Sequence, residues 1–552
     1  MSSYVEKPSS LQSAESYTSD STTVIRHTKF SKVEAFLFFS ISFILSIIEG
    51  YSLVFRYRIV YVDAWTRSLE ALYAVFQGQL HLAGMGFVWN PLPSLLSIPF
   101  AIFRNVWPPL MQYGFADNII SSLFMGFGIL YLNRILDRFQ VQRGYRILWC
   151  LLFFFNPLIL LYSGNGMTDS MMASVCFAMI DGVIDYFQNN RIMGLVTSSV
   201  WSAAGFMLRY EDIPIVGMVM IGVLLSEYRH SKKLNKAISV SLIYVFLTIS
   251  AVLVWILLNW MIMGNPFYFA DSRYSNAAQI GNGSYNTPFM MASDHHLLTA
   301  IKQVAEFTIL FWPFGLVALV IIIFQLRKKV DFIGLPILLG SFGTPILQIM
   351  LLYKHASAEW ARFFIYYIPF GFMLSGYIVY LLEKKRKIIK HFLLVLSIPI
   401  FISADILTLH ALQNPIWGNG ESGFVNEILK GTGATGQESS SGYFSSGKEI
   451  ATYINAHPNL KVIMSSFTSF YAIPYINNPN NLVISNDSNY NAVLANPRGI
   501  VNAILVTNYT LSNSTRMSSL YPGLWAGQVT WTKLIKQFSD GTRLYAILPD
   551  AP

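Results

Sequence analysis

Tyr61–Pro93, which reads YVDAWTRSLEALYAVFQGQLHLAGMGFVWNPLP, follows the first long apolar segment of the chain. Asp63, Arg67 and Glu70 recur at helical spacing within it, so one helix face presents two carboxylates and a guanidinium. Apolar residues with a period of 3.6 continue as far as Leu80 and predict a helix lying along a membrane surface. The two prolines near the end are expected to stop any helix and turn the chain back towards the bilayer. Taken alone, these charges fit a solvated loop as well as they fit a binding site.

The composition is that of a membrane protein with many spans. The 552 residues are 53% hydrophobic and only 12% charged, whereas a soluble chain carries about 25% charged residues. Long apolar runs recur along most of the chain, which predicts a polytopic α-helical membrane protein. The net charge of +9 comes largely from short basic clusters between these runs, so it indicates orientation in the membrane and no nucleic-acid partner.

Eleven membrane spans are expected from the apolar runs. They cover residues 34–55, 112–133, 146–163, 168–187, 194–209, 212–227, 237–262, 303–325, 332–352, 362–382 and 389–408. When the Ser- and Thr-rich, disordered tail 1–30 is placed in the cytoplasm, nearly all Lys and Arg clusters fall in cytoplasmic loops. The external side then receives the loop that contains Asp63 and everything from residue 409 onwards.

The last part of the chain changes character. Residues 31–408 form the membrane module, with external loop helices expected at 61–104, and the Gly- and Ser-rich residues 409–446 predict a linker. Residues 447–552 alternate short β-rich runs with helix-like stretches, so we expect a small external α/β domain. Its strands are expected at Lys461–Ser465, Leu482–Ser485, Ala503–Val506 and Arg543–Leu548.

Charged side chains gather in the turns of the external side. Besides the three residues in the first loop, they include Asp169, Arg209, Glu211, Arg273, His355, Glu359 and Arg362. Each cluster alone fits a solvated helix end, but several on one side predict a shared cavity, because ionisable groups at span ends usually face a cavity or a partner. Arginine suits a phosphate or diphosphate, and a carboxylate suits the deprotonation of a hydroxyl nucleophile.

Several of these residues resemble a known family. The acidic residue after the first span, in Asp63-Ala-Trp-Thr-Arg67, resembles the first outer loop of the GT-C glycosyltransferases. The relevant branch contains the protein mannosyltransferases, aminoarabinose transferases and RgtA/B/C/D-like enzymes. Asn165-Gly-Met-Thr-Asp169, Arg209-Tyr-Glu211 and the segment from Arg362 resemble later outer-loop landmarks, and the likeness covers residues 34–408.

The resemblance implies a glycosyltransferase that moves a hexose or pentose from a polyprenyl- or dolichyl-phosphate donor to an acceptor hydroxyl outside the membrane. Asp63 is then the catalytic residue that activates or orients the acceptor, for an inverting displacement at the anomeric carbon. The candidates for binding the leaving lipid phosphate are Arg67, Arg209 and Arg362, and Asp169 and Glu211 are expected to shape the sugar or acceptor site. The other candidate substrate-binding residues are Glu70, Asn90, Arg273, His355 and Glu359. This chain has Ala64 where the family often has a second acidic residue, and Asn90 where many relatives have a histidine.

Other features of the reaction are less determined by the sequence. The acceptor is a glycan, a lipid or a protein, and membrane lipid surrounds the spans. We assign no metal ligands and no cofactor, and we leave open whether a divalent metal takes part. The alternative function is a multi-pass transporter or flippase for a lipid-linked or anionic substrate, although the chain shows no internal repeat and its charges gather at one face.

Overall fold

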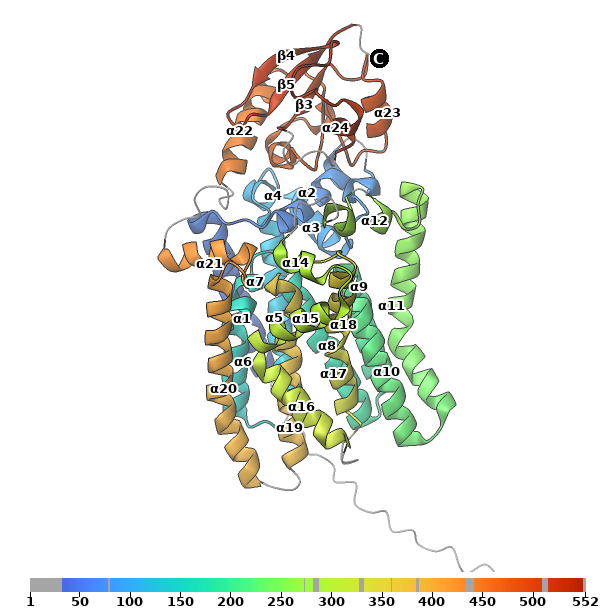
Figure 1. The fold of residues 1–552 in the computed structure, drawn as a ribbon, viewed down its shortest axis with the longest axis vertical. Helices are drawn as coiled ribbons and strands as arrows, with labels where there is room; N and C mark the ends of the chain where they lie inside the picture. The colour runs from blue at the N-terminus through green and yellow to red at the C-terminus, as the bar shows by residue number, and fades with distance from the viewer. Residues whose placement is uncertain are drawn as a thin grey trace, which may run out of the picture.

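Helices dominate the computed structural model, which describes residues 32–77, 80–272, 274–280, 287–326, 332–358, 360–383, 387–431, 441–508 and 515–549. A bundle of long helices carries a small domain of helices and strands at one end, which we call the domain end (Figure 1). The expectations for the tail 1–30, for Arg273 and for Glu359 lie outside the described residues.

Within the described ranges, eight continuous helical segments are long and apolar enough to cross a membrane. They are α1 with η1 (Lys32–Tyr57), α5 (Phe115–Arg138), α8 (Thr168–Asn189), α10 (Asp212–Ser231), α11 (Leu234–Met263), α17 with α18 (Gly334–Tyr353), η4 with most of α19 (Ala361–Leu382) and most of α20 (Ile388–Gln413). The bounds of the elements that make up the composite segments are α1 (Lys32–Tyr51), η1 (Ser52–Tyr57), α17 (Gly334–Gly340), α18 (Gly343–Tyr353), η4 (Ala361–Phe364), α19 (Tyr367–Glu383) and α20 (Lys387–Gln413). The expected polytopic helical membrane protein is confirmed.

The three remaining expected spans are helical but are not long, continuous helices. α6 (Arg143–Phe155) and α7 (Pro157–Ser163) are bent by 72°, and α15 (Leu297–Leu310) and α16 (Trp312–Leu326) are bent by 104°. Each bend falls beside a proline, which lacks the N–H that would continue the preceding helix. α9 (Ile192–Leu208) has only 17 residues. The count of eleven is therefore reached only if the bent pairs and this short helix are included.

Close packing of glycines holds α1 against the turn that follows α7. A Cβ atom at Gly50 would lie 2.2 Å from the carbonyl oxygen of Gly164, closer than real Cβ atoms approach. Small residues allow such approaches between helices in membranes. The contact fixes the first span beside the turn that leads to Asp169.

Short helices lie between the bundle and the small domain: α2 (Val62–Phe76), η2 (Leu82–Met85), α3 (Leu92–Ile102) and α4 (Pro109–Gln112) (Figure 1). The apolar face of α2 does not lie open to a membrane surface as expected, because it packs under the small domain. Trp65 is fully buried and lies 5.4 Å from the ring of Phe444 and 5.3 Å from that of Phe470. The helix also ends before Leu80, which is 77% exposed. The prolines near the end of this stretch begin α3 instead of only stopping a helix, since a first-turn proline loses no hydrogen bond.

Further short helices continue along the domain end: α12 (Tyr268–Asp271), α13 (Asn276–Gln279), α14 (Pro288–Ser293) and α21 (Gly420–Lys430). The expected linker 409–446 is thus partly helical, because α20 runs into it, α21 lies within it and α22 (Ser441–Ala456) begins inside it.

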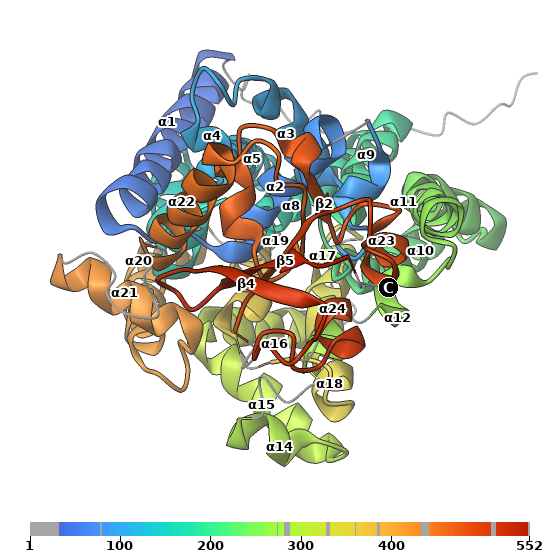
Figure 2. The same cartoon turned by 90° about the horizontal axis from the view of Figure 1, so that it is seen from above.

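The C-terminal domain contains one five-stranded sheet in the order β2-β1-β3-β5-β4. β1 (Val462–Met464) pairs in parallel with β2 (Leu482–Ile484) and with β3 (Ala503–Val506). β5 (Arg543–Ile547) runs antiparallel to both of its neighbours, β3 and β4 (Thr532–Gln537). Its other elements are α22, η6 (Phe470–Tyr475), η7 (Pro479–Asn481), α23 (Tyr490–Ala495) and α24 (Arg516–Leu520). The expected α/β domain and its four expected strands are present, and β4 was missed. Viewed from above, the domain covers the middle of the bundle over α2 (Figure 2).

Candidate active site

An ion pair between distant parts of the chain lies at the centre of the domain end. Asp63 stands in the first turn of α2, and Arg362 lies in η4 at the start of a span. The Nη1 and Nη2 atoms of Arg362 lie 3.3 and 3.4 Å from Oδ2 of Asp63. The arginine side chain is 11% exposed and also lies over the ring of Trp360, 4.2 Å from its centroid. The aspartate side chain is 61% exposed. The buried guanidinium of Arg362 is therefore paired with a carboxylate, that of Asp63, which solvent can reach.

A second, more deeply buried group surrounds Arg209. Its Nη1 atom lies 2.9 Å from Oδ2 of Asp169, and its Nη2 atom lies 2.7 Å from Oε1 of Glu211. Nη1 also donates to Thr168, at 3.2 Å. Burial alone would lower the pKa of Arg209, but the two carboxylates outweigh burial and raise that pKa well above its ordinary value. Burial likewise would raise the pKa of Glu211, whereas Arg209 lowers it below its ordinary value. Both groups are thus held in their charged forms.

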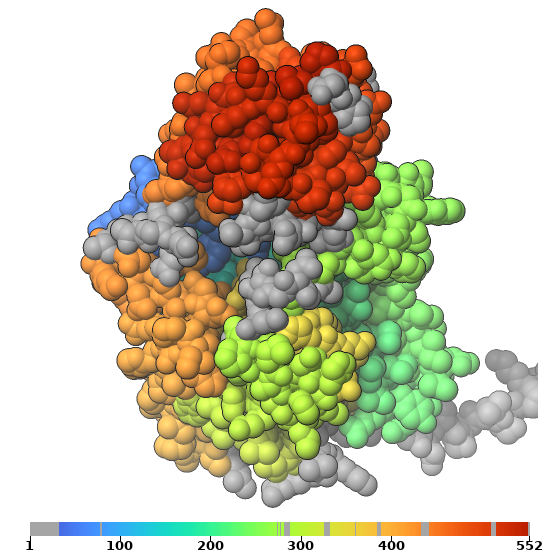
Figure 3. Space-filling model, turned by 45° about the horizontal axis from the view of Figure 1, so that its top comes forward, coloured from blue at the N-terminus to red at the C-terminus, as the bar shows by residue number. Residues whose placement is uncertain are grey.

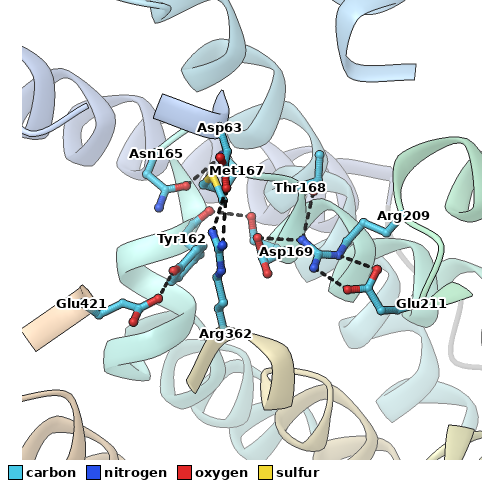
Figure 4. A network of polar contacts seen from close by, with 11 residues as sticks. Asp63, Tyr162, Asn165, Met167, Thr168, Asp169, Arg209, Glu211, Arg362 and Glu421 are labelled. Carbon is cyan, nitrogen blue, oxygen red and sulfur yellow. Dashed lines mark hydrogen bonds and ion pairs between the residues drawn. The ribbon is translucent and has the colours of Figure 1, made fainter. Parts of the chain in front are cut away.

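The two charged groups are neighbours. Asp63, Arg362, Asp169, Arg209 and Glu211 come from four separate segments, and their side chains converge in one region (Figure 4). The charge of Arg362 contributes to the low pKa of Glu211. These five side chains make one charged cluster, which we call the charged centre.

Tyr162 and Glu421 extend the charged centre on the side of α21. The hydroxyl of Tyr162 donates a hydrogen bond to Oε1 of Glu421, which is 4% exposed. Burial raises the pKa of Glu421, and the charge of Arg362 and the Tyr162 hydrogen bond oppose this only in part.

Arg67 and Glu70 form a separate pair further along α2. Nη1 of Arg67 lies 3.2 Å from Oε2 of Glu70, and the Ser94 hydroxyl donates to the same oxygen at 2.5 Å. Burial raises the pKa of Glu70 despite these partners. The guanidinium of Arg67 lies 5.6 Å from the ring centroid of Trp89. On the face of α2 that these residues share, Asp63 pairs with Arg362 and Arg67 pairs with Glu70.

A cavity of about 170 Å³ lies beside Asp63, between α2 and the C-terminal domain. Asp63, Thr66 and Glu70 line it from α2, and Ser466 and Asn486 are among the residues that line it from the domain. Figure 3 shows the C-terminal domain, in red and orange, seated across the end of the bundle. The cavity is thus bounded by two parts of the protein.

Known proteins resemble this chain in structure and not in sequence. No family model matches the sequence, and no curated protein matches it. Among solved structures, ArnT from Cupriavidus metallidurans bound to undecaprenyl phosphate matches with a TM-score of 0.53 and 11% identity, over 94% of this chain and 98% of that one. The apo state of the same protein gives a TM-score of 0.50 and 10% identity over the same shares. This chain has the ArnT fold. The expected GT-C type architecture is confirmed by a match that covers nearly the full length of both chains.

Four expected site residues lie elsewhere in this ArnT-like fold or outside the described residues. Asn90 is 2% exposed, and its Nδ2 atom donates to the carbonyl oxygen of Phe206 at 2.5 Å, so its amide fastens a loop to the end of α9. Arg273 and Glu359 are not among the described residues. His355 stands in the turn between α18 and η4 with a φ of 52°.

Sequence reasoning missed Glu421, Tyr162 and Asp117. Asp117 is fully buried and accepts hydrogen bonds from Ser68 and, at 2.9 Å, from Ser97. Glu421 was overlooked because its helix lies in the stretch expected as a linker, although the apolar period that begins at Phe424 was a signal for that helix. Asp117 did carry a signal, because a carboxylate inside an expected span, here 112–133, marks a candidate functional site. No sequence signal distinguishes Tyr162 from the other residues of apolar spans.

Metal binding was left open by the sequence. Among the described residues, no group of three or more His, Cys, Asp or Glu side chains is arranged to hold a metal ion. The carboxylates of the charged centre are instead bound by arginine.

Proposed function

We propose that the chain is a membrane glycosyltransferase, which moves a sugar from a polyprenyl- or dolichyl-phosphate donor to an acceptor hydroxyl outside the membrane. The observation that carries the proposal is the ion pair of Asp63 with Arg362, which lies beside a cavity at one end of an ArnT fold. The solved ArnT structure with this fold is bound to undecaprenyl phosphate, a lipid phosphate. The ArnT-like fold gives no support to the alternative function as a transporter or flippase.

Arg362 is our candidate for binding the leaving lipid phosphate. The sequence left Arg67, Arg209 and Arg362 open for this role. Arg209 lies between two carboxylates and Arg67 lies against buried Glu70, so both are already engaged by buried anions. Arg362 is instead paired with the exposed carboxylate of Asp63, so of the three arginines it is the one whose counter-ion is accessible to a substrate.

Asp63 is our candidate for the base. In the proposed reaction the acceptor oxygen attacks the anomeric carbon, the bond from that carbon to the phosphate oxygen breaks, and the acceptor proton passes to Asp63. The phosphate leaves on its lipid with both bonding electrons, and Arg362 stabilises the negative charge. Asp169, Arg209 and Glu211 form the rigid wall of the site, since all three are held by one another.

The site faces the outside in this proposal. The sequence places the Lys- and Arg-rich loops at the opposite end of the spans from Asp63, and such loops remain in the cytoplasm. The N-terminal tail is then cytoplasmic and the C-terminal domain external, with a glycan, a lipid or a protein as acceptor.

Replacing Asp63 by asparagine tests the proposal. We expect Asp63→Asn to reduce sugar transfer from labelled polyprenyl-phosphate sugars about 10²- to 10⁴-fold, the usual contribution of a general base. Because the variant removes the counter-charge of Arg362, which is 11% exposed, its thermal stability is measured beside that of the wild type, and turnover is compared for folded protein. Asp271→Asn is the matched control, because Asp271 is an exposed carboxylate on α12. Retained turnover in Asp63→Asn would exclude Asp63 as the base, and a wild-type chain that turns over no such donor would exclude the function.

A further inference from the structure

The cavity beside Asp63 lies where two parallel strands of the C-terminal domain end. Ser466 and Phe467 follow β1, and Ser485 and Asn486 follow β2. In open α/β sheets, ligands bind in the crevice outside the carboxyl ends of parallel strands. The small domain therefore presents its own ligand-binding edge to α2.

The hydroxyl and amide groups at this edge are held in place by one another. Backbone N–H of Ser466 donates to the hydroxyl of Ser485 at 2.9 Å, and the Ser466 hydroxyl donates to Oδ1 of Asn486 at 2.5 Å. Asn486 in turn donates from Nδ2 to the carbonyl oxygen of Gly84, in η2, at 3.0 Å. This last bond joins the domain to the membrane module, so the two walls of the cavity are fixed relative to each other.

Aromatic rings supply the apolar surface of the cavity. Trp89 and Tyr268 line it from the membrane module, and Phe467 lines it from the domain. The rings of Tyr274 and Phe467 lie 5.4 Å apart, with Phe467 still 39% exposed. Sugars present C–H faces and a rim of hydroxyls, so aromatic rings beside hydroxyl, amide and carboxylate groups match a sugar ring.

The charged side chains of the lining are acidic. Asp63 and Glu70 line the cavity, and no lysine or arginine is among the described residues that line it. Each carboxylate is paired with an arginine that is not a lining residue, Asp63 with Arg362 and Glu70 with Arg67. A neutral, hydroxyl-bearing occupant can donate to the carboxylates and accept from the serine hydroxyls, whereas a phosphate finds no cation in the described lining.

We propose that this cavity is the acceptor subsite and that it binds an uncharged sugar residue of a glycan. The inference rests on the proposed glycosyltransferase function and narrows its acceptor from glycan, lipid or protein to a neutral glycan. Asp63 contributes to both the cavity and the Arg362 pair, so a hydroxyl in the cavity reaches the base while the lipid phosphate lies at Arg362. Phe467, Ser466 and Asn486 then make the C-terminal domain a determinant of acceptor choice.

Direct binding tests this assignment without any need for turnover. The full-length chain is placed in lipid nanodiscs, since sugar-headed detergents would compete, and methyl hexopyranosides and their 6-phosphates are titrated by saturation-transfer NMR. We expect at least one neutral glycoside to bind, and its 6-phosphate to bind at least tenfold more weakly. Phe467→Ala should weaken the neutral ligand roughly tenfold, the effect of losing one aromatic contact. Leu534→Ala is the control, because Leu534 is 47% exposed on β4 at the far edge of the sheet.

Three results would overturn the subsite: no neutral glycoside binds, the phosphorylated sugar binds more tightly, or Phe467→Ala binds like the control. A parallel assay of sugar transfer from polyprenyl-phosphate donors separates this failure from failure of the function. Turnover with an acceptor KM unchanged by Phe467→Ala rejects the subsite alone. Absence of turnover in the wild type, with glycoside binding that depends on Phe467, rejects the function and leaves a sugar-binding site.

Discussion

Replacing Arg209 by glutamine removes the one cation that two buried carboxylates share. The side chain of Arg209 is 11% exposed, that of Asp169 is 0% exposed and that of Glu211 is 18% exposed. The contacts are short, at 2.9 Å to Asp169 and 2.7 Å to Glu211. Glutamine restores at most one of these hydrogen bonds and none of the charge.

The cost of the substitution follows from what remains unpaired. Breaking a buried ion pair by removing one partner costs about 3–5 kcal/mol, because the remaining charge stays buried. Arg209→Gln leaves two such charges, so we expect the upper part of that range. Asp169→Asn leaves Arg209 bound to Glu211 through two hydrogen bonds, so its cost should be smaller, about 1.5–3 kcal/mol for one charged hydrogen bond.

Equilibrium unfolding in mixed micelles, followed by tryptophan fluorescence at increasing SDS, measures these free energies. Arg143→Gln is the control, because Arg143 is 72% exposed and pairs with Glu34 at 3.3 Å. An exposed ion pair contributes only about 0–1 kcal/mol. If Arg209→Gln unfolds within about 0.5 kcal/mol of Arg143→Gln, the claim that burial makes the Arg209 pairs strong is refuted.

Three further predictions concern two acidic groups and the glycine contact. Burial would raise the pKa of Glu211, but Arg209 lowers that pKa below 4.5. The contribution of Glu211 to the stability of the fold is therefore present above pH 4.5 and is lost as the pH falls through the folded pKa. Glu211→Gln should remove this loss of stability at acid pH, measured as unfolding midpoints against pH. Burial raises the pKa of Glu421 above 4.5, so the contribution of Glu421 to the stability of the fold is complete below pH 4.5 and is lost as the pH rises through the folded pKa. Glu421→Gln should flatten this decline of stability with pH, and an unchanged profile of unfolding midpoint against pH would contradict the prediction. Gly50→Ala should lower the free energy of unfolding by about 1–3 kcal/mol through overpacking. Gly217→Ala should not lower it, because a Cβ there meets nothing within 4 Å, and equal effects at the two positions would refute the close contact.

The spans could be predicted because the physics behind them is local. Lipid offers no hydrogen bonds to the backbone, so a long apolar run must be a helix. Where the helices bend was less evident, although Pro157 and Pro313 mark both bends. The surroundings of α2 could not be predicted, because an amphipathic helix has the same pattern whether its apolar face meets lipid or protein. In the structure Trp65 of this face packs against Phe444, a residue hundreds of positions further along the chain.

The charged centre was only partly predictable for the same reason. Asp63, Arg209 and Arg362 stood out because several ionisable clusters at span ends fell on one side of the membrane. Which of them pair depends on how the spans pack, and local patterns along the chain do not give that packing. Glu421 is an example, because it is a lone carboxylate near a Gly-rich stretch in the sequence. Its place beside the charged centre depends on the packing of α21 against Tyr162.

The pairing of Asp63 with Arg362 also orders events during synthesis. The two residues are separated by 299 positions, which a ribosome working at 5–20 residues per second translates in roughly 15 to 60 s. During that interval the nascent aspartate has no guanidinium beside it, and the β1 and β2 edge that closes the cavity has not yet been made. The nascent chain therefore gains the ion pair at the centre of the proposed active site only after Arg362 is made, and chains that terminate before Arg362 lack it.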